Sequence, residues 1–403
     1  MNKEFKDHKV INDEKMKQNW EIKKLGEVFD LQMGKTPSRD NSEYWGGSNV
    51  WIAISDLQNK YIGDSKEYIT DTALTETKIK KVKAGTTIMS FKLSVGRAAI
   101  TTKDLYTNEA IMAFNLNEGY NLIVDYIYYY LKGCKWQGAN KAVMGLTLNK
   151  ASISQNPIPI PPLPIQEKIV AELDCLRGVI EKKKEQLKEL DALAQSIFYT
   201  MFGDPITNEK GWEVKKLGDS VIEMFLGPFG SALKTDCYVD KNKSYCMIYE
   251  QKHAIKKTME LETKYIDKDK FESLKRFEVH SGDFIMSCRG TIGEIFRLPN
   301  DAPIGIIHPS LMKIRINENV YHPLFFIRLL SIIVKNANTN GNCVQMAITA
   351  KELGTKKPIL PPLTLQQEFA AKVEAIEKQK GLIKESIKEV EDLFNARMQY
   401  YFG

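Results

Sequence analysis

The sequence predicts an α+β protein in which one globular domain occurs twice and each copy is followed by a long helix. The segment WEIKKLG at 20–26 returns as WEVKKLG at 212–218, and a proline-rich segment ending at Glu167 returns with its end at Glu368. Short β-rich runs and one apolar helical stretch separate these motifs in both copies, and a heptad pattern follows them. Solenoid units repeat every 20 to 50 residues or so, whereas a period of about 200 residues is that of a whole domain with its linker.

This repeat divides the chain into five parts. Strand-like and helix-like patterns intermingle within each copy, so we expect two compact α+β domains of about 150 residues. In chain order, the predicted parts are a polar N-terminal tail at 1–19, a first globular domain at 20–164, a central spacer helix at 165–203, a second globular domain at 204–364 and a C-terminal spacer helix at 365–403.

The two spacer helices carry apolar residues at alternating steps of four and three, the pattern of a coiled-coil seam. The seam positions are Ile169, Leu173, Leu176, Ile180, Lys183, Leu187, Leu190, Ala194, Ile197 and Met201 in the first helix and the positions 200 residues later in the second. Each stripe could pack on its own domain, but an unbroken 3.5-residue period over about five heptads favours an antiparallel helix pair. We expect Lys183 and Lys380, which interrupt the seam, to reach solvent or an acidic partner.

Composition indicates a protein with a packed core and a mild excess of positive charge. The chain has 403 residues, of which 43% are hydrophobic and 27% charged, and its formal net charge is +6. That charge suits a polyanionic partner without requiring one. The six cysteines form no CxxC pair, which indicates reduced thiols in a cytoplasmic protein and no zinc site. The first 19 residues lack an apolar core, so we expect no secretory signal, and no apolar stretch is long enough to span a membrane.

Polar and aromatic residues gather in the loops of both copies. GKTPSRDNSEYWGG at 34–47 mixes hydrogen-bond donors with planar rings, and GPFGSALK at 227–234 occupies the equivalent place. Taken singly, each such residue is more typical of a solvated loop, but their recurrence at matching places favours contacts with nucleic acid. The candidate contact residues are Lys35, Thr36, Ser38, Arg39, Tyr44, Trp45, Ser90, Lys92, Asn140 and Lys141 in the first copy and Ser231, Lys234, Ser287, Arg289, Thr291, Asn340 and Gln345 in the second.

Motifs for catalysis are incomplete or missing. MGKTPS contains the GKT of a phosphate-binding loop, but Phe29 stands where its first glycine is needed and Pro37 is incompatible with the helix that should follow. The tetrapeptide of adenine methyltransferases, an Asn or Asp followed by two prolines and an aromatic residue, does not occur, and neither do HExxH and GxSxG. No catalytic or metal-binding residue is therefore assigned, although inspection alone leaves a nuclease centre open.

Taken together, these motifs resemble the specificity subunits of type I restriction-modification systems. The resemblance covers nearly the whole chain, through KLGEVFDLQMGKTPS, the YWGG followed by Trp51 and Asp56, MSCRGTIG, and the two helix starts of the form PPL…Q.E. It implies that the globular copies are target-recognition domains, each of which reads one half of a split double-stranded DNA site. It also implies that the two helices set the gap between the half-sites and dock two modification subunits.

The resemblance further implies a division of labour among subunits. Adenine methylation with S-adenosylmethionine, and ATP- and Mg²⁺-dependent translocation with cleavage, would belong to the modification and restriction subunits, so this chain would need no cofactor and would not be an enzyme. Two other classes stay open. The chain could have nuclease or methylase activity of its own, or it could be a coiled-coil adapter that binds only proteins; a salt-dependent affinity for DNA would argue against the adapter.

Overall fold

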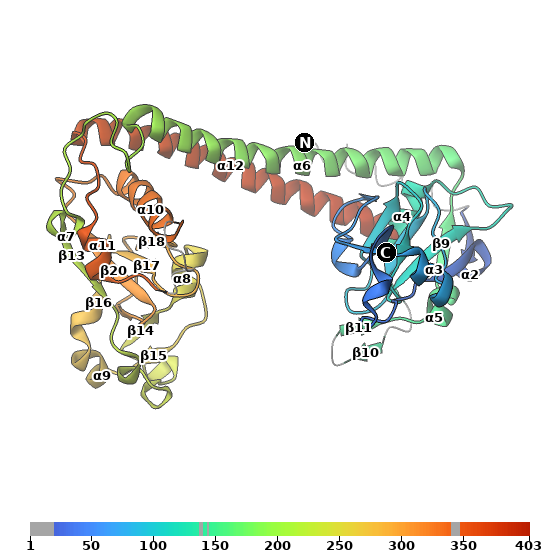
Figure 1. The fold of residues 1–403 in the computed structure, drawn as a ribbon, viewed down its shortest axis with the longest axis horizontal. Coiled ribbons are helices and arrows are strands. Elements are labelled where there is room, and N and C mark those ends of the chain that lie inside the picture. The colour runs from blue at the N-terminus through green and yellow to red at the C-terminus, as the bar shows by residue number, and fades with distance from the viewer. Residues whose placement is uncertain (1–19, 137–139, 143–144, 340–346) are drawn as a thin grey trace, which may run out of the picture. The chain divides into compact units, whose positions relative to one another are not determined.

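The computed structural model describes residues 20–136, 140–142, 145–339 and 347–403, and the predicted tail at 1–19 lies outside them. The chain forms two compact units. The first unit contains residues up to Lys184 together with Lys384–Gly403, and the second contains Glu185–Ile383. Both units repeat one order of elements, and two long helices, α6 (Leu163–Phe202) and α12 (Leu363–Phe402), each contribute to both units (Figure 1).

In the first unit, a five-stranded sheet of order β2-β9-β6-β7-β4 packs against a three-stranded sheet of order β5-β3-β8. The described residues of this unit also form two short strand pairs, β1-β12 and β10-β11. The strands are β1 (Glu21–Lys24), β2 (Phe29–Met33), β3 (Trp45–Ile52), β4 (Tyr61–Ile62), β5 (Glu67–Ile69), β6 (Thr87–Ser90), β7 (Ala98–Thr101), β8 (Tyr106–Thr107), β9 (Ile111–Leu116), β10 (Asn140–Ala142), β11 (Gly145–Thr147) and β12 (Pro157–Ile160). The helices before α6 are α2 (Leu25–Val28), α3 (Asp71–Thr77), α4 (Val124–Gly133) and α5 (Lys150–Gln155).

In the second unit, a four-stranded sheet of order β13-β20-β17-β18 packs against another of order β15-β14-β19-β16. Its strands are β13 (Val221–Leu226), β14 (Cys246–Tyr249), β15 (Tyr265–Ile266), β16 (Glu278–Val279), β17 (Phe284–Ser287), β18 (Ile295–Arg297), β19 (Gly305–Ile307) and β20 (Leu311–Ile316). Its helices are α7 (Leu217–Ser220), α8 (Gln251–Lys256), α9 (Lys268–Ser273), α10 (Pro323–Thr339) and α11 (Ala350–Thr355). The predicted α+β class with two similar domains is confirmed.

β6 and β17, which are inner strands of the two main sheets, are buried at every residue, and each carries two adjacent apolar residues that face opposite sides of the sheet. In β6, Met89 belongs to the core shared with α4, whereas its neighbour Ile88 belongs to the core between the two sheets. In β17, Met286 and Ile285 divide in the same way. Successive side chains of a strand point to opposite faces, so the matching TIMS and FIMS segments build the same three-layer arrangement of helix, sheet and sheet.

A buried glutamine fixes the start of each long helix. The side-chain oxygen of Gln166 accepts a hydrogen bond of 2.8 Å from the Ile123 amide, and its nitrogen donates to the Pro161 carbonyl at 2.8 Å. Gln366 makes the same bonds to the His322 amide and the Pro361 carbonyl. Because all polar atoms of these glutamine side chains are used, each helix leaves its domain in a defined direction.

The two long helices pair as an antiparallel coiled coil. Their contacts run in opposite order along the two sequences: Glu172 pairs with Arg397 and Lys184 with Glu391 in the first unit. In the second unit, Lys380 of the predicted seam binds Asp191 at 2.7 Å. The acidic partner expected for this lysine is therefore present, and the predicted seam residues are buried or half-buried.

The ends of the long helices also complete the domain cores. Ile169 at the start of α6 and Phe402 at the end of α12 belong to the core of the first unit. Phe202 and Phe369 belong to the core of the second unit and lie 5.6 Å apart between ring centroids. The helix ends therefore pack on the domains, as the alternative interpretation expected, while the helices also pair with each other. Within the described residues, no helix is both long and apolar enough to cross a membrane.

Candidate nucleic-acid interface

A turn between β8 and β9 joins the loops of the first unit that carry candidate contact residues. The backbone amides of Gly34, Lys35 and Phe91 donate to carbonyls of Ile111, Thr107 and Ala110 at 3.1, 2.8 and 2.9 Å. A Cβ atom at Gly34 would lie 2.2 Å from the Thr107 carbonyl oxygen, so only glycine allows this approach. The loop after β2 and the loop after β6 are thus fixed to one turn.

The second unit repeats this construction. The amides of Gly227 and Cys288 donate to the carbonyls of Leu311 and Ser310, each at 2.9 Å, in the turn between β19 and β20. A Cβ atom at Gly227 would lie 2.3 Å from the carbonyl oxygen of His308. The glycine contact is therefore kept between GKTPS and GPFGS, but the second hydrogen bond, from Lys35 to Thr107, has no counterpart because Pro228 lacks an amide hydrogen.

A third segment joins each group of loops. Lys92 forms an antiparallel bridge with Thr147, and Arg289 forms the corresponding bridge with Ala347. We call residues 34–45, 91–97 and 145–149, which surround the turn at 107–111, the first loop cluster. The second loop cluster consists of residues 227–237, 288–294 and 347–349 around the turn at 308–311.

In the first loop cluster, most candidate side chains already have partners. Lys35 donates to the Thr77 carbonyl at 2.7 Å, the Thr36 hydroxyl bonds Glu109, and the Tyr44 hydroxyl donates to Glu76 at 2.6 Å. The Trp45 indole donates to the Ser38 carbonyl at 3.0 Å. The Lys92 ammonium is half-buried and lies 5.4 Å from the centre of the Phe91 ring. Lys35, Ser38 and Arg39 are exposed and face solvent in part.

Arg39 is held by an aromatic stack and an acid. Its guanidinium lies 3.9 Å from the centre of the Trp45 ring and pairs with both carboxylate oxygens of Glu67. Trp51 packs edge-on against Trp45 with ring centroids 5.1 Å apart. The hydrogen bond from Arg39 lowers the pKa of Glu67, so this ion pair is maintained at neutral pH.

In the second loop cluster, the candidate side chains are more exposed. Ser231, Lys234, Arg289 and Thr291 all face solvent. The carbonyls of Arg289 and Thr291 accept hydrogen bonds from the side-chain nitrogen of Gln251 at 2.7 and 3.3 Å, so the first residue of α8 supports this loop.

Two candidate serines shape the loops from within. Ser90 and Ser287 are fully buried. The hydroxyl of Ser90 bonds the Ser94 carbonyl, and that of Ser287 accepts from the Glu294 amide at 3.0 Å. Contact with a ligand would require these turns to open.

The four remaining candidates belong to segments that are described in part or not at all. The backbone of β10 pairs with β11, so that Asn140 lies opposite Thr147 and Lys141 opposite Leu146. The side chains of Asn140 and Lys141 lie outside the described part of the structure, and so do Asn340 and Gln345 entirely.

The family model for the type I restriction modification DNA specificity domain matches the chain twice, at residues 17–192 and 209–392. The chain belongs to this family. The two matches correspond to the two repeated copies, so each unit contains one specificity domain. This is a family of recognition domains, which agrees with the expectation of a non-catalytic subunit.

Individual relatives agree with this assignment. A type I restriction enzyme MjaIX specificity subunit from Methanocaldococcus jannaschii is 30% identical over 227 residues, and the match spans 51% of this chain and 52% of that protein. The chain thus spans about half the length of that relative. A putative MjaX specificity subunit from the same organism is 24% identical over 94% of this chain and 91% of its own length. A solved structure from work on complex assembly and conformational transition of the type I R-M system has the same fold, with a TM-score of 0.65, 17% identity and coverage of 96% and 98%.

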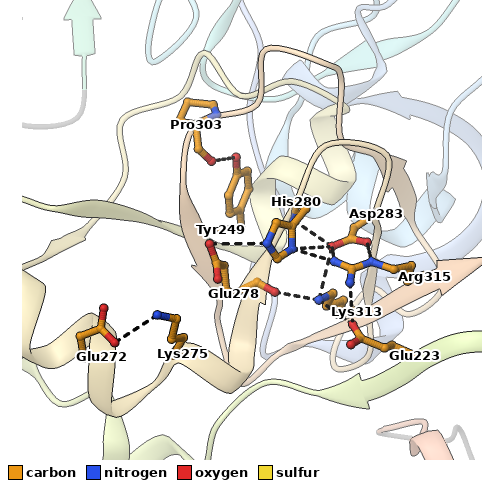
Figure 2. Close-up of polar contacts among 10 residues, drawn as sticks. All are labelled: Glu223, Tyr249, Glu272, Lys275, Glu278, His280, Asp283, Pro303, Lys313 and Arg315. Carbon is orange, nitrogen blue, oxygen red and sulfur yellow. Dashed lines mark hydrogen bonds and ion pairs between the residues drawn. The ribbon is translucent and has the colours of Figure 1, made fainter.

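The second specificity domain also contains an ionic cluster, with a buried lysine and a buried aspartate, that the sequence analysis did not identify (Figure 2). The Lys313 ammonium, 3% exposed, lies 2.8 Å from Glu223 and 3.4 Å from Asp283, which is 1% exposed. Arg315 donates to the Asp283 carboxylate at 2.7 Å and, as an obligate donor, also to Nδ1 of His280 at the same distance. The charged residues of LMKIRI in β20 were the signal in the sequence.

This ionic cluster joins β13 and β20 to the turn before β17. Glu223 lies in β13, which ends just before Gly227, and Asp283 precedes β17, which ends just before Cys288 and Arg289. The hydrogen bond from Lys313 lowers the pKa of Glu223, and the bond to Asp283 raises the pKa of Arg315. Both shifts favour the charged forms, so the ion pairs that join β13, β20 and the turn before β17 are maintained at neutral pH.

Among the described residues, no group of three or more His, Cys, Asp and Glu side chains is arranged to hold a metal ion. Burial raises the pKa of the Cys134, Cys246 and Cys288 thiols to about 12, so these cysteines are protonated and unreactive at neutral pH. What the loop clusters offer is hydrogen-bond donors, positive charge and aromatic rings, which is the chemistry of polyanion recognition.

Proposed function

We propose that the chain is the DNA-recognition subunit of a type I restriction-modification complex and that it reads a two-part, asymmetric site. The observation that carries this proposal is the pair of loop clusters, which share one attachment to a turn but present different side chains. Two identical readers would require a palindrome, whereas two different readers match an asymmetric sequence. Each specificity domain would read one half-site.

Within each domain, we assign the exposed and half-buried cations of the loop clusters to DNA. Arg289 is suited to a bidentate contact with guanine, whereas Lys35, Lys92 and Lys234 are suited to point contacts with phosphate or a base edge. To contact DNA, Arg39 would have to leave Glu67. It therefore adds to affinity only where its contact with DNA is stronger than that ion pair. Ser90 and Ser287 act by holding the loops in position.

The partners follow from membership of the family. We propose that two modification subunits dock on the paired helices, that restriction subunits join this assembly, and that the complex works on double-stranded DNA in the cytoplasm. S-adenosylmethionine, ATP and Mg²⁺ would be bound by those partners. The nature of the relatives, which are named as subunits of restriction enzymes, supports this division.

Sequencing of methylated bases tests the proposal directly. The chain is expressed with its modification subunits in a host without other adenine methylation, and the methylated sites are mapped. We expect methyladenine in both halves of one split, non-palindromic sequence. A continuous or palindromic site, or no methylation by an assembled complex, would refute the proposal. A matched culture without this chain serves as control and should show no methylation.

A further inference from the structure

Phe229 is the most exposed large apolar side chain among the described residues, with 89% of its surface accessible. Single exposed apolar residues are common on proteins, but this one lies in the second loop cluster, on the loop that begins at Gly227. The role proposed above for this loop rests on the charge of Lys234 and gives no function to an apolar ring. The ring therefore needs an explanation within the proposed interface.

The backbone that carries this ring is anchored on both sides. On one side, the Gly227 amide is bonded to Leu311 at 2.9 Å, and Pro228, which has a restricted φ, is buried. On the other side, the Phe229 carbonyl accepts from the Ala232 amide at 2.8 Å, and Leu233 is buried in a hydrophobic core. Because this turn is anchored, little backbone freedom is lost when the ring binds a partner.

The charges around Phe229 favour nucleic acid over an apolar protein surface. Lys234 follows on the same loop, and Arg289 lies one residue beyond Cys288, which is bonded to the same turn as Gly227. Both cations are exposed; Asp236 is an exposed acid on this loop. In the first loop cluster, the matching position is Thr36, whose hydroxyl is bonded to Glu109. The apolar ring thus belongs to the second domain alone.

We propose that Phe229 packs against the bases of the half-site read by the second specificity domain. This inference rests on the proposed function and adds a contact of a different chemistry. Aromatic and other apolar side chains either contact thymine methyl groups in the major groove or wedge between base steps in the minor groove. Lys234 and Arg289 would fix the DNA backbone and base edges on either side of the ring.

The dependence of affinity on salt distinguishes an apolar base contact from a phosphate contact. The full chain, assembled with its modification subunits, is titrated with a duplex that carries the mapped site at several salt concentrations. For F229A, we expect affinity to fall roughly 5- to 100-fold, as for the loss of one aromatic contact with a base. The slope of log affinity against log salt should stay unchanged, because no counterion release is lost. For K234A, the slope should instead fall by about 1.

Two further variants serve as controls. F229W keeps a planar apolar ring and should retain most of the affinity. I304A removes another exposed apolar side chain of the same unit, 51% accessible and located before β19, and should bind like the wild type.

Three outcomes would overturn the inference. F229A could bind with wild-type affinity, it could change the salt slope, or it could reduce assembly with the modification subunits while the assembled complex kept its affinity; the last result would make Phe229 a protein contact. These outcomes are distinct from failure of the proposed function, in which the wild-type complex itself would not prefer the mapped duplex over an unrelated one.

Discussion

At the scale of single residues, the two specificity domains differ in the hydrogen bonds they can offer from equivalent positions. Lys92 and Arg289 occupy equivalent positions, because each forms an antiparallel bridge with the third segment of its own loop cluster. Lysine offers a compact charge, whereas arginine offers a planar fork that matches guanine. The same scaffold position can therefore serve different half-sites.

We predict that R289A disturbs only the half-site read by the second domain and K92A only that read by the first. A lost base contact should cost about 1 to 3 kcal/mol at one position, whereas a lost phosphate contact should weaken all sites alike. Methylation rates on a library of duplexes with single base changes measure both effects. A change in base preference at the opposite half-site would contradict the assignment.

The Glu223 carboxylate should make the second domain sensitive to acid. Lys313 lowers its folded-state pKa, so its contribution to stability is complete above the pKa of the unfolded chain and is lost as pH falls through the folded pKa. We expect E223Q to be less stable than the wild type at pH 7, with a difference that shrinks below about pH 4, the ordinary range for glutamate. Urea unfolding of the full chain across this pH range is the measurement, and E260Q, at an exposed glutamate, is the control. A difference that did not change with pH would contradict the assignment.

At the scale of elements, each long helix runs from one unit into the other without a break. The chain passes from one unit to the other within α6, after Lys184, and within α12, after Ile383. Each domain core also contains residues of both helices. Helix length should therefore control the spacing of the two readers without altering either one.

We predict that inserting seven residues after Lys184 and seven after Ile383 lengthens the unread gap of the DNA site. One heptad preserves the seam and adds about 10 Å of helix, close to the rise of three base pairs at roughly 3.4 Å each. Mapping of methylated sites should show both half-sites unchanged and a gap about three base pairs longer. The same insertion in α6 alone should impair folding, because the seam partners in α12 would no longer match. An altered half-site with the original gap would rule out this role of the helices.

At the scale of the whole molecule, the chain combines two recognition domains with no assigned catalytic group. Its net charge of +6 is modest for a protein that binds DNA by itself. Tight binding should therefore depend on the surfaces contributed by the modification subunits.

We predict that the isolated chain binds DNA weakly, with strong salt dependence, and transfers no methyl group. Addition of modification subunits should produce tight, site-specific binding and adenine methylation. Fluorescence anisotropy and transfer of labelled methyl groups from S-adenosylmethionine measure these two properties. Methyl transfer by the isolated chain, free of modification subunits, would contradict the prediction. A chain that bound partner proteins but showed no salt-dependent affinity for DNA would instead be an adapter.

The repeat, the α+β class and the helix pair could be predicted from the sequence. These features follow from local signals: the recurrence of WEIKKLG, the prolines that precede each helix, and a heptad step that needs no knowledge of distant residues. The sequence also identified the loops that carry the candidate contact residues and the resemblance to specificity subunits. The domain boundaries and the roles of individual contact residues stay predictions.

Only the tertiary structure decided how the candidate residues are used. The joining of three loops at one turn, the exposure of Phe229 and the pairing of Arg39 with Glu67 depend on contacts between segments that are far apart in the chain. The same holds for the ends of α6 and α12, where Glu172 and Arg397 are 225 residues apart in sequence. Periodicity reports which face of an element is buried, but it does not report which distant side chain lies opposite, because that depends on how the sheets and helices pack together.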